Sequence, residues 1–167
     1  MGQNHDDSRK IYTDLNTLLT NKKRDWMITG ITISKVEGKI DSVETLSKQR
    51  FPRLNINIDD VAGNNDRLNV NYTFVADYFD GVGKEAKSIG QIKLGGVIEV
   101  SETKDAANAV IKKWNDNHSL PVELAEEIIN DLNFRCSATG TLVAYSLGLI
   151  PPLMISTTKI TEKKTEK

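Results

Sequence analysis

The sequence predicts an α+β fold, in which a four-stranded antiparallel sheet carries two C-terminal helices packed on one face. Two observations lead to this prediction. Apolar and polar residues alternate in several segments before Val100, whereas after Val100 the apolar residues recur every three or four positions. Alternation is typical of a half-buried strand, and the longer period is typical of an amphipathic helix. Strands that are followed by helices in this way favour a sheet with the helices segregated to one side.

Strands are expected at residues 25–37, 53–59, 68–79 and 88–100. The third has the clearest pattern, because six apolar positions lie on one face: Leu68, Val70, Tyr72, Phe74, Ala76 and Tyr78. A turn is expected at 62–67, and the loop at 80–87 should reverse the chain so that the last two strands pair antiparallel. In the first strand the apolar phase slips near Gly30, which indicates a β-bulge.

Two helices are expected in the C-terminal half. The first carries an apolar face at Ala106, Ala107, Val110, Ile111 and Trp114, with Ser101 or Thr103 as its N-cap. The second opens at Pro121, runs to Leu147 and ends at Gly148, before Pro151 and Pro152, which prevent continuation. Its polar stretch 135–141 contains Gly140, which favours a kink there.

Length and composition limit the remaining choices. The 167 residues fit one domain, expected at 11–155, with a short helix at 11–19 and disordered ends at 1–10 and 156–167. A net charge of −1 provides no overall field for nucleic acid, and no apolar run approaches the ~20 residues of a membrane helix. A single cysteine favours a reducing compartment, so we expect a cytoplasmic protein that neither binds nucleic acid nor inserts into membranes.

Little in the sequence indicates catalysis. His118 lies beside Asp116 in the loop between the helices, but no nucleophile is placed with the pair. Cys136 falls on the apolar stripe of the second helix, as a buried thiol would. Residues 81–84 fail the phosphate-loop pattern, and two histidines with one cysteine cannot build the usual zinc sites. We therefore expect no catalytic residues, no metal, no cofactor and no enzyme, and an enzyme using His118 is the weakest hypothesis.

Apolar surface remains as the candidate functional feature. Four strands and two helices leave edges and faces uncovered, which self-association or a bound peptide would bury. Periodicity alone selects six candidate peptide-binding residues: Tyr72, Phe74, Tyr78, Leu142, Tyr145 and Ile150.

The fourth strand contains an unusual pair of glycines, Gly95 and Gly96, within LGGVIEV. Glycine weakens a strand unless a bulge or a close backbone approach requires it. We therefore expect a positive φ at one of the two, or another main chain in van der Waals contact with one of them. Like Pro151 and Pro152, the pair is assigned a structural role.

Three features in this order resemble the SecB family of export chaperones. They are the segments RLNVNYTFVADYF and KSIGQIKLGGVIEV, the helix junction SLPVELAEEII, and the helix end YSLGLIPPLMI. The resemblance covers residues 25–154. It implies the four-stranded sheet with two helices, pairing into dimers or a homotetramer, and binding of unfolded polypeptide in apolar grooves without ATP.

The resemblance thus implies an ATP-independent holdase for unfolded or nascent polypeptides, with protein export and a toxin–antitoxin system both open as its pathway. The alternative is a structural or adaptor homo-oligomer that binds one folded partner and uses its apolar faces for assembly.

Overall fold

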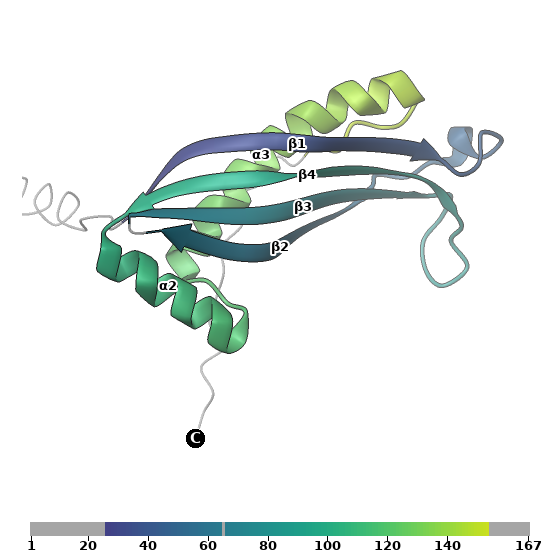
Figure 1. Cartoon of the computed structure of the whole chain (residues 1–167). Helices are drawn as coiled ribbons and strands as arrows, with labels where there is room; N and C mark the ends of the chain where they lie inside the picture. The colour runs from purple at the N-terminus through teal and green to yellow at the C-terminus, as the bar shows by residue number, and fades with distance from the viewer. Residues whose placement is uncertain (1–25, 65, 154–167) are drawn as a thin grey trace, which may run out of the picture.

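The computed structural model describes residues 26–64 and 66–153. The elements are β1 (Trp26–Ile40), the short 3-10 helix η1 (Leu46–Lys48), β2 (Arg53–Asn64), β3 (Arg67–Phe79), β4 (Ser88–Glu102), α2 (Lys104–Asn117) and α3 (Val122–Leu147) (Figure 1). The helix predicted at 11–19 and the disordered ends predicted at 1–10 and 156–167 lie outside the described residues.

The four strands form one antiparallel sheet in the order β1-β4-β3-β2. β2 pairs antiparallel with β3, and β3 pairs antiparallel with β4. The second of these pairings is the one that the reversal at 80–87 predicts. β1 pairs with β4, so the segment 41–52 crosses one end of the sheet to reach β2. Consequently β1 and β2 are the two edges of this sheet.

Bulges adjust the phase of both edge strands. In β1 the register shifts between Ile28 and Gly30, where the sequence predicts a bulge, and again between Ile33 and Lys35. In β2 it shifts between Ile58 and Asp60. A single extra residue moves the following apolar side chains to the other face, so each bulge restores the phase. The predicted turn at 62–67 is accordingly wrong in extent, because β2 continues pairing to Asn64 after its bulge.

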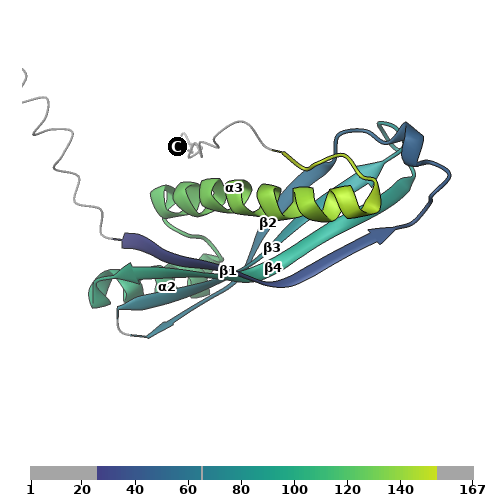
Figure 2. The ribbon, with the colours of Figure 1, turned by 90° about the horizontal axis from the view of Figure 1, so that it is seen from above.

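Both helices pack against the same face of the sheet, which confirms the predicted α+β arrangement. Figure 2 shows α3 lying along this face. Tyr72 of β3 lies beside Cys136 of α3, close enough for each to affect the pKa of the other. Near the start of β3, the side chain of Leu68 and the side chain of Ile111 from α2 both lie against Gly63 of β2. The opposite face is polar and carries exposed residues such as Asn55 and Asn57. The hydrophobic core therefore lies between one sheet face and the two helices.

α3 is the longest helix in the described part of the chain. Its 26 residues span about 39 Å, and Gly148 ends it in the left-handed conformation with φ 70°, as predicted. The helix is unbroken through 135–141, and it runs straight in Figure 2 where the sequence favours a kink. Gly140 serves packing instead: a Cβ at this position would lie 2.8 Å from Cγ of Pro152. The chain beyond the helix thus folds back against α3.

The glycine pair in β4 is explained by one close approach. Neither glycine has a positive φ. A Cβ on Gly96, however, would collide with the carbonyl oxygen of Thr32 on β1. Gly95 is different, because its nearest neighbours would be 3.6 Å from a Cβ, an ordinary contact distance. The second of the two predicted alternatives is therefore confirmed, for Gly96.

Candidate functional site

Three of the six predicted peptide-binding residues are part of the core. Tyr72, Phe74 and Tyr78 on β3 are at most 1% exposed, because α3 and the segment after it cover this face of the sheet. The hydroxyl of Tyr78 donates a hydrogen bond of 2.8 Å to the carbonyl of Ile150, and burial raises its pKa well above the usual range. These three residues offer no open surface in the folded chain, so their assignment as peptide-binding residues is corrected to core packing.

The other three predicted residues lie on or beyond α3. Leu142 and Tyr145 are 70% and 72% exposed, whereas Ile150 is half-buried and belongs to the segment that returns over the sheet. Pro152 is buried against Gly140, and Pro151 is half-buried beside it. The structural role assigned to the two prolines therefore fits their position at the point where the chain turns back.

Sequence reasoning missed Phe134, which is 78% exposed near the middle of α3. It lies on the side of the helix that faces away from the sheet, together with a set of residues that we call the outer stripe: Phe134, Ala138, Thr141, Leu142 and Tyr145. A helical wheel of α3 places this stripe opposite the buried stripe that contains Leu132 and Cys136. The position of Phe134 on the outer side could therefore have been found from the helical spacing in the sequence.

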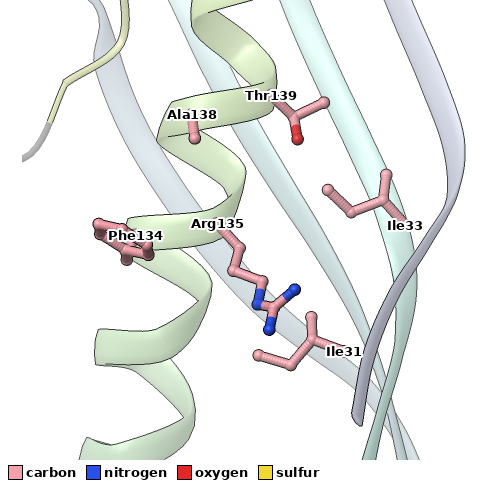
Figure 3. Close-up of a pocket in the computed structure, with 6 residues that line it drawn as sticks. All are labelled: Ile31, Ile33, Phe134, Arg135, Ala138 and Thr139. Carbon is pink, nitrogen blue, oxygen red and sulfur yellow. The ribbon is translucent and has the colours of Figure 1, made fainter.

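A groove with a volume of about 410 Å³ lies between α3 and the edge strand β1 (Figure 3). Ile31 and Ile33 of β1 form one wall. On the α3 side, Arg135 and Thr139 project towards β1, and the lining continues over the helix to Phe134 and Ala138, whose side chains point away from β1. In the close-up, Arg135 extends from the helix towards Ile31, so one guanidinium group enters a largely aliphatic groove.

Contacts on either side of the groove hold α3 to β1. Towards the N-terminal half of α3, the indole of Trp26 donates a hydrogen bond of 3.1 Å to a carboxylate oxygen of Glu127. Towards the C-terminal half, Gly38 of β1 lets the helix come close, because a Cβ there would lie 2.8 Å from Val143 and 2.6 Å from Leu147. The groove is therefore the stretch of the α3–β1 boundary between two firm contacts.

The C-terminal end of α3 is also clamped by the segment that joins β1 to β2. The side-chain amide of Gln49 donates to the carbonyl of Gly148 at 2.9 Å, and its oxygen accepts from the amide of Ile150 at 2.7 Å. One side chain thereby satisfies a carbonyl and an amide where the helix ends. This bonding fixes the position of α3, and with it the wall of the groove.

The electrostatic character of this region changes along α3. Burial, followed by the neighbouring Glu127, raises the pKa of Asp131, while Arg135 opposes the shift. Glu123, Glu126, Glu127 and Asp131 all belong to the first ten residues of the helix, whereas Arg135 is the one charged residue in the remainder. The groove therefore has a positive group inside it and acidic groups towards its Trp26 end.

The groups considered for catalysis lie elsewhere. His118 is the exposed C-cap of α2, with φ 51°, and contacts Trp114 edge-on at 5.4 Å between ring centroids. Cys136 is fully buried, and burial raises its pKa to about 11 although the Tyr72 hydrogen bond opposes the shift. Neither residue lines the groove. Within residues 26–64 and 66–153, no group of three His, Cys, Asp or Glu side chains is placed to hold a metal ion.

None of the helices in the described part of the chain is long and apolar enough to cross a membrane. No protein-family model matches the sequence, and a search of curated proteins finds no significant similarity.

Proposed function

We propose that the protein is an ATP-independent chaperone, a holdase that binds unfolded or extended polypeptide in the groove between α3 and β1. The observation that carries the proposal is this groove together with the exposed apolar outer stripe beside it. Large apolar residues at 70–78% exposure on one helix face form the kind of surface that binds another chain. The resemblance to SecB adds an independent reason to expect this class of function.

The dimensions of the groove suit an extended chain. Side chains on one face of an extended chain repeat about every 6.6 Å, and residues one helical turn apart, such as Arg135 and Thr139, repeat about every 6 Å. Successive inward side chains of a client can therefore meet successive turns of α3. Ile31 and Ile33 provide apolar contact on the facing strand, and Arg135 provides a partner for an acidic side chain.

The edge position of β1 offers a second source of affinity. Among the strands of the described sheet, β1 pairs with β4 alone. Its other edge has backbone amide and carbonyl groups with which an extended client can form a further strand. Main-chain hydrogen bonds do not depend on the client sequence, which suits a protein that holds many unfolded chains. The proposed setting is the cytoplasm, with clients from protein export or from a toxin–antitoxin system.

The test is suppression of aggregation of a chemically denatured protein after dilution, without ATP. We expect near-stoichiometric amounts of the chain to keep the client in solution. Aggregation at the rate of a control with an inert protein would reject the proposal.

A structural or adaptor homo-oligomer is the second candidate, because the same outer stripe can be consumed entirely by assembly. Co-purification from the native host separates the two. One constant folded partner favours the adaptor, whereas many unfolded clients favour the chaperone.

A further inference from the structure

The segment that follows α3 already packs against one side of the helix. It leaves α3 at Gly148 and returns along it, so that Pro152 lies against Gly140. On the way, the carbonyl of Ile150 accepts the hydrogen bond from Tyr78, which seats the segment on β3 as well. This is the side of the helix away from β1 and from the groove (Figure 3). The chain therefore runs antiparallel to α3 when it passes Pro152.

Two buried polar side chains lie farther along this side of α3. Asn133 and Ser137 are 5% and 4% exposed, and in the described part of the chain neither side chain has a hydrogen-bond partner. Buried polar groups are almost always bonded, because an unsatisfied one costs stability. Asn133 precedes Gly140 by seven residues, or about two turns, and it leaves the helix about 160° from Arg135, which points towards β1. A partner for the two side chains must therefore come from the side on which Pro152 lies.

The continuation of the chain has the reach to supply this partner. Asn133 lies about 10.5 Å before Gly140 along the helix axis, and an extended chain covers this distance in about three residues. A chain that continues from Pro152 in the same direction therefore reaches Asn133 near Ile155. Residues 154–158 contain no proline, so each has a backbone N–H as well as a carbonyl to offer.

Gln49 shows how a side-chain amide bonds such a segment. Its NH₂ group donates to the carbonyl of Gly148, and its oxygen accepts from the amide of Ile150, so one side chain bonds both kinds of main-chain group. Asn133 carries the same amide group and can bond an extended main chain in the same way. The hydroxyl of Ser137, one turn along the helix, can donate to a carbonyl of the same segment.

Charge favours the same occupant. Glu126 lies about two turns before Asn133 on the same side of α3, level with about three further residues of an extended chain. A chain that passes Asn133 near Ile155 reaches this level close to Lys159, which is the first charged residue after α3. From Lys159 to residue 167 the sequence has four lysines and two glutamates, so a basic segment meets the acidic N-terminal half of the helix.

We propose that residues 154–159 dock along this side of α3 as an extended C-terminal strap whose main chain bonds Asn133 and Ser137. Lys159 at its end then lies beside Glu126. The strap holds α3 from the side opposite the groove, over the edge of the sheet where β2 carries three half-buried apolar residues: Leu54, Ile56 and Ile58. The inference does not depend on the groove binding a client, and its test contains no client.

Amide hydrogen exchange of the full chain tests the strap directly. After correction for intrinsic rates, we expect residues 154–158 to exchange at least about tenfold more slowly than residues 161–167, which lie beyond the strap. Asn133→Leu nearly keeps the size of the side chain and suits a helix, but it removes the amide, so it should abolish this protection. Asn115→Leu makes the same change at an exposed residue of α2 and should leave the protection intact.

Equal exchange of the two segments in the wild type would overturn the inference. Protection that Asn133→Leu leaves unchanged would also overturn it, because the strap would then not be bonded to Asn133. Circular dichroism verifies that both variants keep the helix content of the wild type.

The position of the strap is tested separately, in chains that keep Asn133. Glu126→Cys with Lys159→Cys should form a disulfide under oxidised glutathione at least about tenfold faster than Glu126→Cys with Thr165→Cys. Position 165 lies about 20 Å farther along an extended chain, beyond the reach of a disulfide. The native Cys136 is fully buried and should not compete. Equal rates for the two pairs would show that the strap is not held along α3, and the inference would fail.

Discussion

Tyr72 on β3 donates a hydrogen bond across Gly96 on β4 to the carbonyl of Thr32 on β1, with 3.3 Å between the two oxygens. Tyr72 and Gly96 are directly paired in the register, and a Cβ on Gly96 would lie 2.9 Å from the Tyr72 hydroxyl oxygen. The missing side chain therefore gives the phenol room to cross one strand and reach the next. This contact ties three strands together on the face that α3 covers.

Gly96→Ala should destabilise the protein, and Gly95→Ala should not. The added methyl group at position 96 meets the Thr32 carbonyl and the Tyr72 hydroxyl, so we expect a loss of about 3 kcal/mol in the free energy of unfolding. At position 95 the nearest atoms are 3.6 Å away, so the change should stay within about 0.5 kcal/mol. Urea unfolding of both variants measures the difference. Equal losses would show that the strand, rather than this contact, requires glycine.

Gln49→Ala should loosen the C-terminal end of α3. The substitution removes two hydrogen bonds, to Gly148 and from Ile150, and we expect a cost of about 1–2 kcal/mol in the free energy of unfolding. Lys48→Ala, at the exposed neighbouring residue, is the control and should be close to neutral. Thermal unfolding with amide exchange at Leu149 and Ile150 monitors the effect. Unchanged exchange at these residues would contradict the claim that the two Gln49 hydrogen bonds hold the C-terminal end of α3 in place.

Stability should fall with rising pH between about 9 and 11 in part because of Cys136. Its pKa is 9.0 ordinarily and about 11 in the folded protein, so below pH 9 the thiol is protonated in both states. Above pH 9 the unfolded chain loses the proton first, which favours unfolding until the folded pKa is passed. Cys136→Ala should therefore have a shallower pH dependence in this interval, with the remaining slope from Tyr72 and Tyr78. Identical slopes in urea unfolding would reject the burial of this thiol.

The strands of the sheet could be predicted because the alternation of apolar and polar residues that marks a strand is contained within a few consecutive residues. Alternation in 68–79 places Tyr72 and Phe74 on one face whatever the rest of the chain does. The same signal could not distinguish a binding face from the core, since that depends on which helices cover it. The sequence also contained no sign that β2 resumes pairing after its bulge, because the continuation rests on contacts of Gly63 with β3 and α2.

The groove could not be predicted because it depends on a distance between two segments far apart in sequence. Phe134 and Arg135 were visible as neighbours on α3, and Ile31 and Ile33 as neighbours on β1. The hydrogen bond from Trp26 to Glu127 and the approach of α3 to Gly38 together fix where the helix touches β1 and where a groove remains. The exposed outer stripe, by contrast, follows from helical geometry alone.

Filling the groove should reduce binding of an unfolded client. Thr139 is half-buried in the groove wall, and Thr139→Trp should occupy space that a client side chain would use. Val82→Trp adds the same ring on an exposed loop and should bind like the wild type. We expect the dissociation constant for a fluorescently labelled, permanently unfolded polypeptide to rise about tenfold for Thr139→Trp alone. Equal affinities of the two variants would place the client elsewhere.

Amide hydrogen exchange of the whole chain, with and without a permanently unfolded polypeptide, tests the central claim most directly. If the client lies between α3 and β1, exchange should slow at Gly30–Ile33 and along 134–139. It should remain unchanged on the polar face at Asn55–Asn57. Protection confined to that polar face, or no protection anywhere, would contradict the proposal that this groove holds extended polypeptide.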